Sequence, residues 1–83
     1  MKGWTSLASN FRGEVHTTID QREGKIRVVI AANYDKIVAI ADSLDEAASL
    51  ANARARQAGI REDHMIQALS IAHSEAVDAM EAE

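Results

Sequence analysis

The sequence predicts an α+β fold: a three-stranded antiparallel meander over residues 14–42, followed by an α-hairpin. Three observations favour this fold. Polar and β-branched residues alternate in short runs between turn residues, a helix start signal stands at Ser43, and helical periodicity resumes after Gly59. The chain has 83 residues and no Pro-rich or Gly-rich linker, so we expect a single domain over residues 1–83. Residues 1–13 are expected to form an N-terminal arm.

Each predicted strand has its own side-chain pattern. The first, 14–19, alternates strictly, and the turn over 20–24 ends in a glycine that can adopt a positive φ. The second, 25–32, is rich in β-branched residues and has the strongest strand pattern of the chain. A tight turn over 33–36 leads to the third, 37–41, which is apolar on both faces. The residues expected on the first face of the first two strands are Val15, Thr17, Ile19, Ile26, Val28 and Ile30.

The second face of this predicted sheet is too apolar to be left in water. The side chains that alternation places there include Val29, Ala31, Val38 and Ile40. A solvated sheet face normally carries polar residues, so another element must cover this one. The candidates are the last helix, a second copy of the chain, and the N-terminal segment with Trp4, Leu7 and Phe11. We expect a homodimer, because an apolar edge strand also favours pairing with another chain.

The first predicted helix, over residues 43–58, has clear start and stop signals. Ser43 and Glu46 form a capping box, and Gly59 is a typical residue at a helix C-terminus. The inward stripe of this helix is mostly alanine, which allows close packing. A second helix is predicted over 61–80, with two acidic residues at its positive end. Its apolar face consists of Met65, Ile66, Leu69, Ala72, Ala76, Val77 and Met80.

Negative charge is concentrated near the C-terminus. The net charge is -4, but residues 1–60 hold eight basic and seven acidic side chains, whereas residues 61–83 hold one basic and six acidic. The acidic balance disfavours a general nucleic-acid binder, which needs a basic patch. No apolar run reaches the roughly 20 residues of a membrane helix, and residues 1–10 do not resemble a signal peptide. Since Cys is also absent, we expect a cytoplasmic protein of a bacterial or phage-infected cell.

The sequence lacks the signatures of catalysis and metal binding. There is no Cys, and no Ser has the context of an activated nucleophile. His64 and His73 are nine residues apart on one helix, about 180° around it, so they cannot share a metal within one chain. His16 is expected on the solvent side of an edge strand, and His73 in a packed or interface position. We therefore expect no enzyme activity and no cofactor.

The segment that joins the sheet to the first helix resembles a known family. Ala41-Asp42-Ser43-Leu44-Asp45-Glu46-Ala47 is similar to the Gly-Asp-Thr-Leu-Glu-Glu-Ala-like phrase of HicB-type antitoxins. The resemblance covers residues 24–58 and implies a partial double-stranded-RNA-binding-type fold that blocks a small basic ribonuclease. As a class, short, acidic, Cys-free chains also resemble phage-encoded anti-defence inhibitors such as anti-CRISPR proteins, which occlude the nucleic-acid-binding surface of a host complex.

These observations favour a non-enzymatic, acidic protein-binding module. We expect its second helix to face a basic protein or nucleoprotein complex that handles nucleic acid, and to neutralise that partner by occlusion. The candidate contact residues are Glu62, Asp63, Glu75, Asp78 and Glu81.

Two alternatives remain open. One is a dimeric DNA-binding regulator similar to ribbon-helix-helix repressors, in which a strand is followed by two helices. Its candidate contacts are Lys25, Arg27, Lys36, Arg54 and Arg56. The other is a self-assembling structural subunit, since an apolar second sheet face serves assembly as well as dimerisation.

Overall fold

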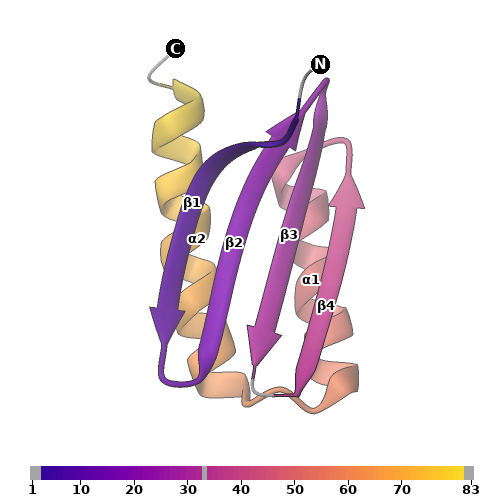
Figure 1. Ribbon diagram of the computed structural model, residues 1–83, viewed down its shortest axis with the longest axis vertical. Helices are drawn as coiled ribbons and strands as arrows, with labels where there is room; N and C mark the ends of the chain where they lie inside the picture. Colours follow the sequence, from indigo (N-terminus) through magenta and orange to yellow (C-terminus); the bar gives the residue numbers. More distant parts are fainter. Residues whose placement is uncertain (1–2, 33, 82–83) are drawn as a thin grey trace.

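The computed structural model describes residues 3–32 and 34–81, and it shows an antiparallel sheet with two helices on one face (Figure 1). The predicted α+β class is confirmed. The sheet contains β1 (Thr5–Arg12), β2 (Val15–Arg22), β3 (Lys25–Ala32) and β4 (Asp35–Ala41), which lie side by side in chain order. The helices are α1 (Leu44–Ala58) and α2 (Glu62–Glu81).

The prediction of three strands preceded by an arm is wrong, because Thr5–Arg12 forms a fourth strand. β1 pairs antiparallel with β2, and the register shifts between Ser6 and Ala8. This bulge breaks the alternation by which a strand is recognised. Beyond the bulge, Asn10 pairs with the buried Thr17 of β2. A large apolar side chain at position 10 would have indicated a strand, but asparagine does not. The prediction that His16 lies on an edge strand is also wrong, since β1 makes β2 an inner strand.

The hairpin between β2 and β3 has the predicted positive φ at Gly24, but the predicted turn over 20–24 is too long, because its first three residues belong to β2. Arg22 pairs with Lys25, so the loop consists of Glu23 and Gly24 alone. Both residues have a positive φ, 49° and 81°, which is typical of a type I′ turn. In the predicted turn over 33–36, Asn33 lies outside the described residues, whereas the last two residues belong to β4.

Both helices lie within one residue of their predicted bounds. At the start of α1, the Ser43 hydroxyl accepts a hydrogen bond from the backbone N of Glu46 at 3.2 Å. At its end, Gly59 takes a left-handed φ of 80° and its N–H bonds to the last carbonyls of the helix. α2 begins at Glu62, one residue after the predicted start.

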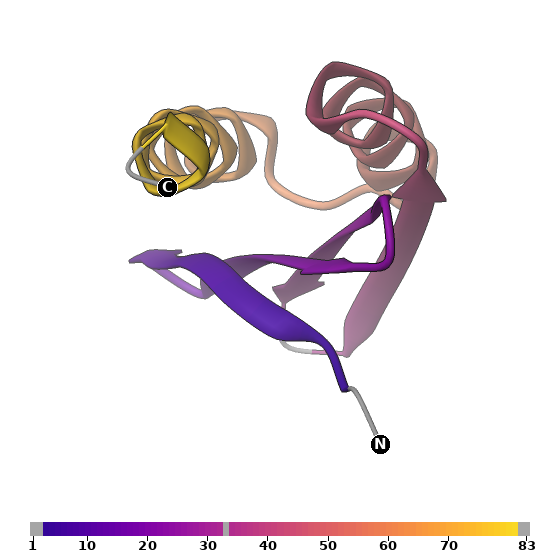
Figure 2. The same cartoon turned by 90° about the horizontal axis from the view of Figure 1, so that it is seen from above.

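The core lies between the sheet and the two helices. α1 packs over β3 and β4, and α2 packs over β1 and β2 (Figures 1 and 2). The first strand and the last helix are therefore neighbours. Buried side chains of the sheet are Ala8, Val15, Thr17, Ile19, Ile26, Val28, Ile30 and Ala39. Those of the helices are Leu44, Ala47, Ala51, Ala55, Met65, Ala68, Leu69, Ala72 and Ala76.

The other side of the sheet, here called the open sheet face, is not covered by either helix (Figure 2). The last helix is thus excluded as its cover, while the N-terminal segment adds two aromatic side chains to it. The Trp4 ring lies 4.4 Å from the guanidinium carbon of Arg27, and Phe11 stacks on His16 with ring centroids 3.9 Å apart. Strand alternation places the following side chains on this face: Ser6, Ser9, Phe11, His16, Thr18, Asp20, Arg22, Lys25, Arg27, Val29, Ala31, Lys36, Val38 and Ile40.

Thr17 carries a buried hydroxyl without a hydrogen-bond partner among the described residues. Thr17→Val keeps the shape of the side chain and removes this unsatisfied group, so we expect the free energy of unfolding to rise by about 1 kcal/mol. Urea unfolding measures this change, and Thr5→Val, at an exposed position of β1, is the control. A loss of stability in Thr17→Val contradicts the assignment and identifies a partner for the hydroxyl, such as Asn10 on the paired strand.

Candidate functional site

The five predicted contact residues of α2 separate into two groups at opposite ends of the helix. Glu62 and Asp63 lie in its first turn, where the helix dipole favours acidic groups. Glu62 Oε1 lies 3.2 Å from Arg56 Nη2, and Asp63 Oδ1 lies 2.9 Å from Arg61 Nε. The pKa of Asp63 is lowered, first by its hydrogen bond from Arg61. These two carboxylates are thus explained by local structure.

Glu75, Asp78 and Glu81 form the second group. All three side chains are exposed, and none has an ion pair among the described residues. The last turn of α2 contains no basic residue, so the negative end of the helix dipole faces acidic side chains alone. Like charges three residues apart on a helix also repel one another. This arrangement lowers helix stability, and no ion pair within residues 3–32 and 34–81 offsets it.

A shallow hollow of about 310 Å³ lies beside this end of α2, where α1 begins. Asp45, from the first turn of α1, and Glu81, from the last turn of α2, both line it. Its remaining lining is mostly apolar and includes Met80, whose side chain is 41% exposed. We call the surface formed by Leu44, Asp45, Val77, Asp78, Met80 and Glu81 the acidic end surface. Sequence reasoning missed Asp45, because its place in a capping box already explained it.

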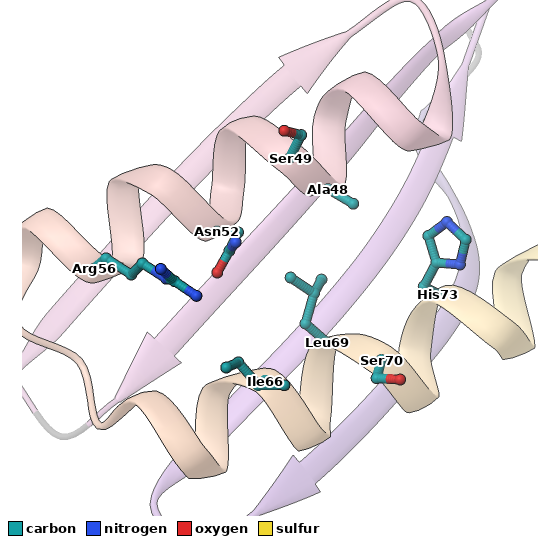
Figure 3. A pocket seen from close by; sticks show the side chains of 8 residues that line it. All are labelled: Ala48, Ser49, Asn52, Arg56, Ile66, Leu69, Ser70 and His73. Atoms are coloured by element: carbon teal, nitrogen blue, oxygen red, sulfur yellow. The ribbon is translucent and has the colours of Figure 1, made fainter.

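A larger groove, of about 440 Å³, runs between the helices (Figure 3). Leu69 and His73 of α2 and Asn52 of α1 point into this space. His73 Nε2 donates to Asp45 Oδ1 at 3.0 Å, a bond that links the two helices next to the acidic end surface. Asn52 Oδ1 is buried and unpaired within the described residues. The groove is lined by Ala48, Ser49, Asn52, Arg56, Ile66, Leu69, Ser70 and His73.

The other two histidines are held near the sheet. His16 Nε2 lies 2.8 Å from Ser9 Oγ, and His64 Nδ1 lies 3.2 Å from Glu14 Oε2. A backbone hydrogen bond, assisted by His64, lowers the pKa of Glu14. A carboxyl whose pKa is lowered on folding adds stability above its ordinary pKa, and that stability is lost as the pH falls through the lowered value.

Among residues 3–32 and 34–81, no group of three or more His, Asp or Glu side chains is placed to hold a metal ion.

The basic residues of the DNA-binding alternative do not form one surface. Lys25 is ion-paired with Asp42, Arg27 with Asp20 at 2.6 Å, and Arg56 with Glu62. Arg54 Nη1 donates to the backbone carbonyl of Val38 at 2.6 Å. The fifth residue, Lys36, is exposed on β4. They are thus spread over the sheet and α1.

Comparisons of the chain with models of protein families, with curated proteins and with solved structures found no match. Within the described residues, no helix has the length and apolar character needed to span a membrane.

Proposed function

We propose that the protein is a non-enzymatic binding protein that occupies a basic, nucleic-acid-binding surface of a partner protein through its acidic end surface. The observation that carries this proposal is the group of carboxylates at the C-terminal end of α2 that have no ion pair in the described part of the chain. A cationic partner compensates the repulsion among these groups and the unfavourable helix dipole. Acidic residues at a helix start are stabilised by the helix dipole and do not require a cationic partner. Glu62 and Asp63 are therefore secondary candidates for partner contact.

The acidic end surface combines charge with an apolar contact. Met80 is 41% exposed and lines the same hollow as the carboxylates of Asp45 and Glu81. A flexible, polarisable Met side chain adapts readily to an apolar anchor on a partner. Carboxylates around such a contact steer a positively charged surface and fix its orientation. The chemistry therefore fits a partner element that presents Lys or Arg beside an apolar side chain.

The alternative of a DNA-binding regulator has less support. Four of its five candidate cations are engaged by groups of the chain itself. Phosphate binding needs several free cations that act together. The helix that a ribbon-helix-helix arrangement would bring to the nucleic acid, α2, carries five carboxylates and no Lys or Arg.

Reversing two charges of the acidic end surface is expected to weaken partner binding. In Asp78→Lys/Glu81→Lys, repulsion replaces attraction, and we expect affinity to fall by at least about tenfold. The measurement is a tagged pull-down from nuclease-treated lysate of the source organism, read by mass spectrometry. We expect the wild-type chain to retain one basic protein in near-stoichiometric amount. Adding the wild-type chain should also prevent that protein from shifting a labelled nucleic acid in a gel.

The matched control changes the same net charge away from α2 and from the candidate contacts. Asp35→Lys/Glu23→Lys alters exposed residues at the start of β4 and in the turn between β2 and β3. Circular dichroism establishes that both double variants are folded. Equal capture by both variants contradicts the acidic end surface as the site. A captured protein that still binds nucleic acid when saturated with the chain contradicts occlusion.

A further inference from the structure

The open sheet face differs in charge from the rest of the molecule. Strand alternation places five charged side chains on it: Asp20, Arg22, Lys25, Arg27 and Lys36. Asp20 and Arg27 are paired with each other at 2.6 Å, and Lys25 is paired with Asp42. Arg22 lies at the end of β2, and Lys36 lies at the opposite end of the face, near the start of β4. The middle of the face is uncharged, with Thr18, Val29 and Val38 side by side on neighbouring strands.

The acidic side chains of the chain lie largely on the opposite side. α2 alone carries five carboxylates and no Lys or Arg, and it packs on the far face of the sheet. Two copies that meet through their helices would bring these charges together. Two copies that meet through their open sheet faces keep the α2 helices apart, with both sheets between them. Among the described residues, the open sheet face carries no unpaired carboxylate, and its two unpaired cations, Arg22 and Lys36, lie at its ends, so a contact through the middle of this face avoids the repulsion between the acidic helices.

The open sheet face is also large enough for a specific contact. Four strands spaced about 4.8 Å apart, of seven or eight residues each at about 3.4 Å per residue, give a face of about 19 by 26 Å. Its area is therefore about 500 Å² per copy, or about 1,000 Å² for two copies, which is near the lower limit for a specific interface. The exposed apolar residues on it include Phe11, Val38 and Ile40, whose side chains are 63%, 38% and 49% exposed.

We infer that two copies of this chain associate face to face through their open sheet faces, as a two-fold symmetric sandwich of sheets. The same patch then serves both copies, as a closed dimer requires. The centre of the contact is formed by Val29 on β3, and one side by Val38 and Ile40 on β4. Phe11, on β1, lies near the other side. An area near the lower limit predicts a dimer that dissociates on dilution in the micromolar range.

One contact favours this arrangement over pairing of strand edges. β4 is an edge of the sheet, and edges of apolar strands tend to pair with other chains. The Arg54 guanidinium donates to the Val38 carbonyl of this strand at 2.6 Å, so one edge acceptor is already occupied. A continuous eight-stranded sheet joined through the β4 edges would require that bond to be broken, whereas a face-to-face sandwich leaves it intact.

The test compares the same substitution on the two sides of the molecule. Ile40→Lys places a charge on the open sheet face, and Ile66→Lys places one on α2 at a similarly exposed residue, 49% against 43%. Sedimentation and light scattering over about 1 µM to 1 mM give the mass. We expect the wild type and Ile66→Lys to reach about 18 kDa, twice the 9.0 kDa of one chain, and Ile40→Lys to remain a monomer.

Each other outcome overturns the inference. A wild-type chain that stays monomeric at about 1 mM has no such interface. A dimer that survives both Ile40→Lys and Val38→Lys uses another surface, such as the β4 edge. Species that grow beyond two copies indicate an open assembly instead of a closed dimer. If Ile40→Lys does not fold, the fluorescence of the wild-type chain still tests the inference. Trp4 is the sole Trp, and it lies against Arg27 on this face. Its emission maximum must therefore shift to shorter wavelength as the dimer forms.

This inference is independent of the proposed partner binding. The acidic end surface and the open sheet face share no residue, and Asp78→Lys/Glu81→Lys should leave the dimer intact. Loss of partner binding and loss of dimerisation are therefore measured by separate variants.

Discussion

Ile30→Ala is expected to lower the free energy of unfolding by about 3–4 kcal/mol. Ile30 lies on β3, an inner strand, and its side chain is fully buried beneath the helices. Alanine at this position removes three carbon atoms and leaves a cavity that the backbone of a paired strand cannot close. For a domain of this size, such a loss lowers Tm by roughly 15–25 °C. Urea and thermal unfolding followed by circular dichroism measure both quantities.

The control is the same substitution at an exposed isoleucine on the helical side. Ile66 is 43% exposed on α2, so Ile66→Ala should cost less than about 1 kcal/mol. Neither residue lies on the open sheet face, so dimerisation does not affect the comparison. Similar losses at the two positions contradict the placement of the core between the sheet and the helices.

Gly13→Ala is expected to cost about 3 kcal/mol, for two separate reasons. Gly13 has a φ of 57°, a conformation that costs an L-residue about 1–2 kcal/mol. A Cβ atom at this position would also lie 2.5 Å from two ring atoms of His64. The ring must turn away, which breaks its hydrogen bond to Glu14. The change thus affects the turn between β1 and β2 together with its contact to the start of α2.

A double-mutant cycle with His64→Ala separates the two causes. When the imidazole is absent, Gly13→Ala retains only the backbone cost, so we expect its effect to fall to about 1–2 kcal/mol. The difference between the two backgrounds measures the steric contact. An unchanged cost in the His64→Ala background means that the glycine is required by its φ alone.

Much of the fold could be predicted from the sequence, because local signals and tertiary packing agree over most of the chain. Ser43 and Gly59 mark the ends of α1, and alternation in β2 and β3 matches the observed burial. β1 could not be predicted in this way. Its inward side chains include Asn10, and its bulge shifts the alternation by one residue. Its pairing depends on β2 and on cover from α2, and neither is visible in the segment itself.

The candidate site was predicted in part. The acidic side chains of α2 are evident from the sequence, but only the structure separates paired Glu62 and Asp63 from the exposed group near Glu81. Asp45 is 36 residues earlier in the chain than Glu81, and only the antiparallel packing of the helices brings the two to one hollow. No local pattern encodes that proximity.

The contact between β1 and α2 has a consequence for the order of events during synthesis. β1 is made first, yet its cover is the last element of the domain. A nascent chain that ends before α2 leaves Val15 and Ile19 of the neighbouring strand exposed to water, together with β1 itself. Closure of the core must therefore wait until α2 has left the ribosome. Until then the unfinished sheet is a substrate for chaperones, and a truncation within α2 will be degraded rather than partly functional.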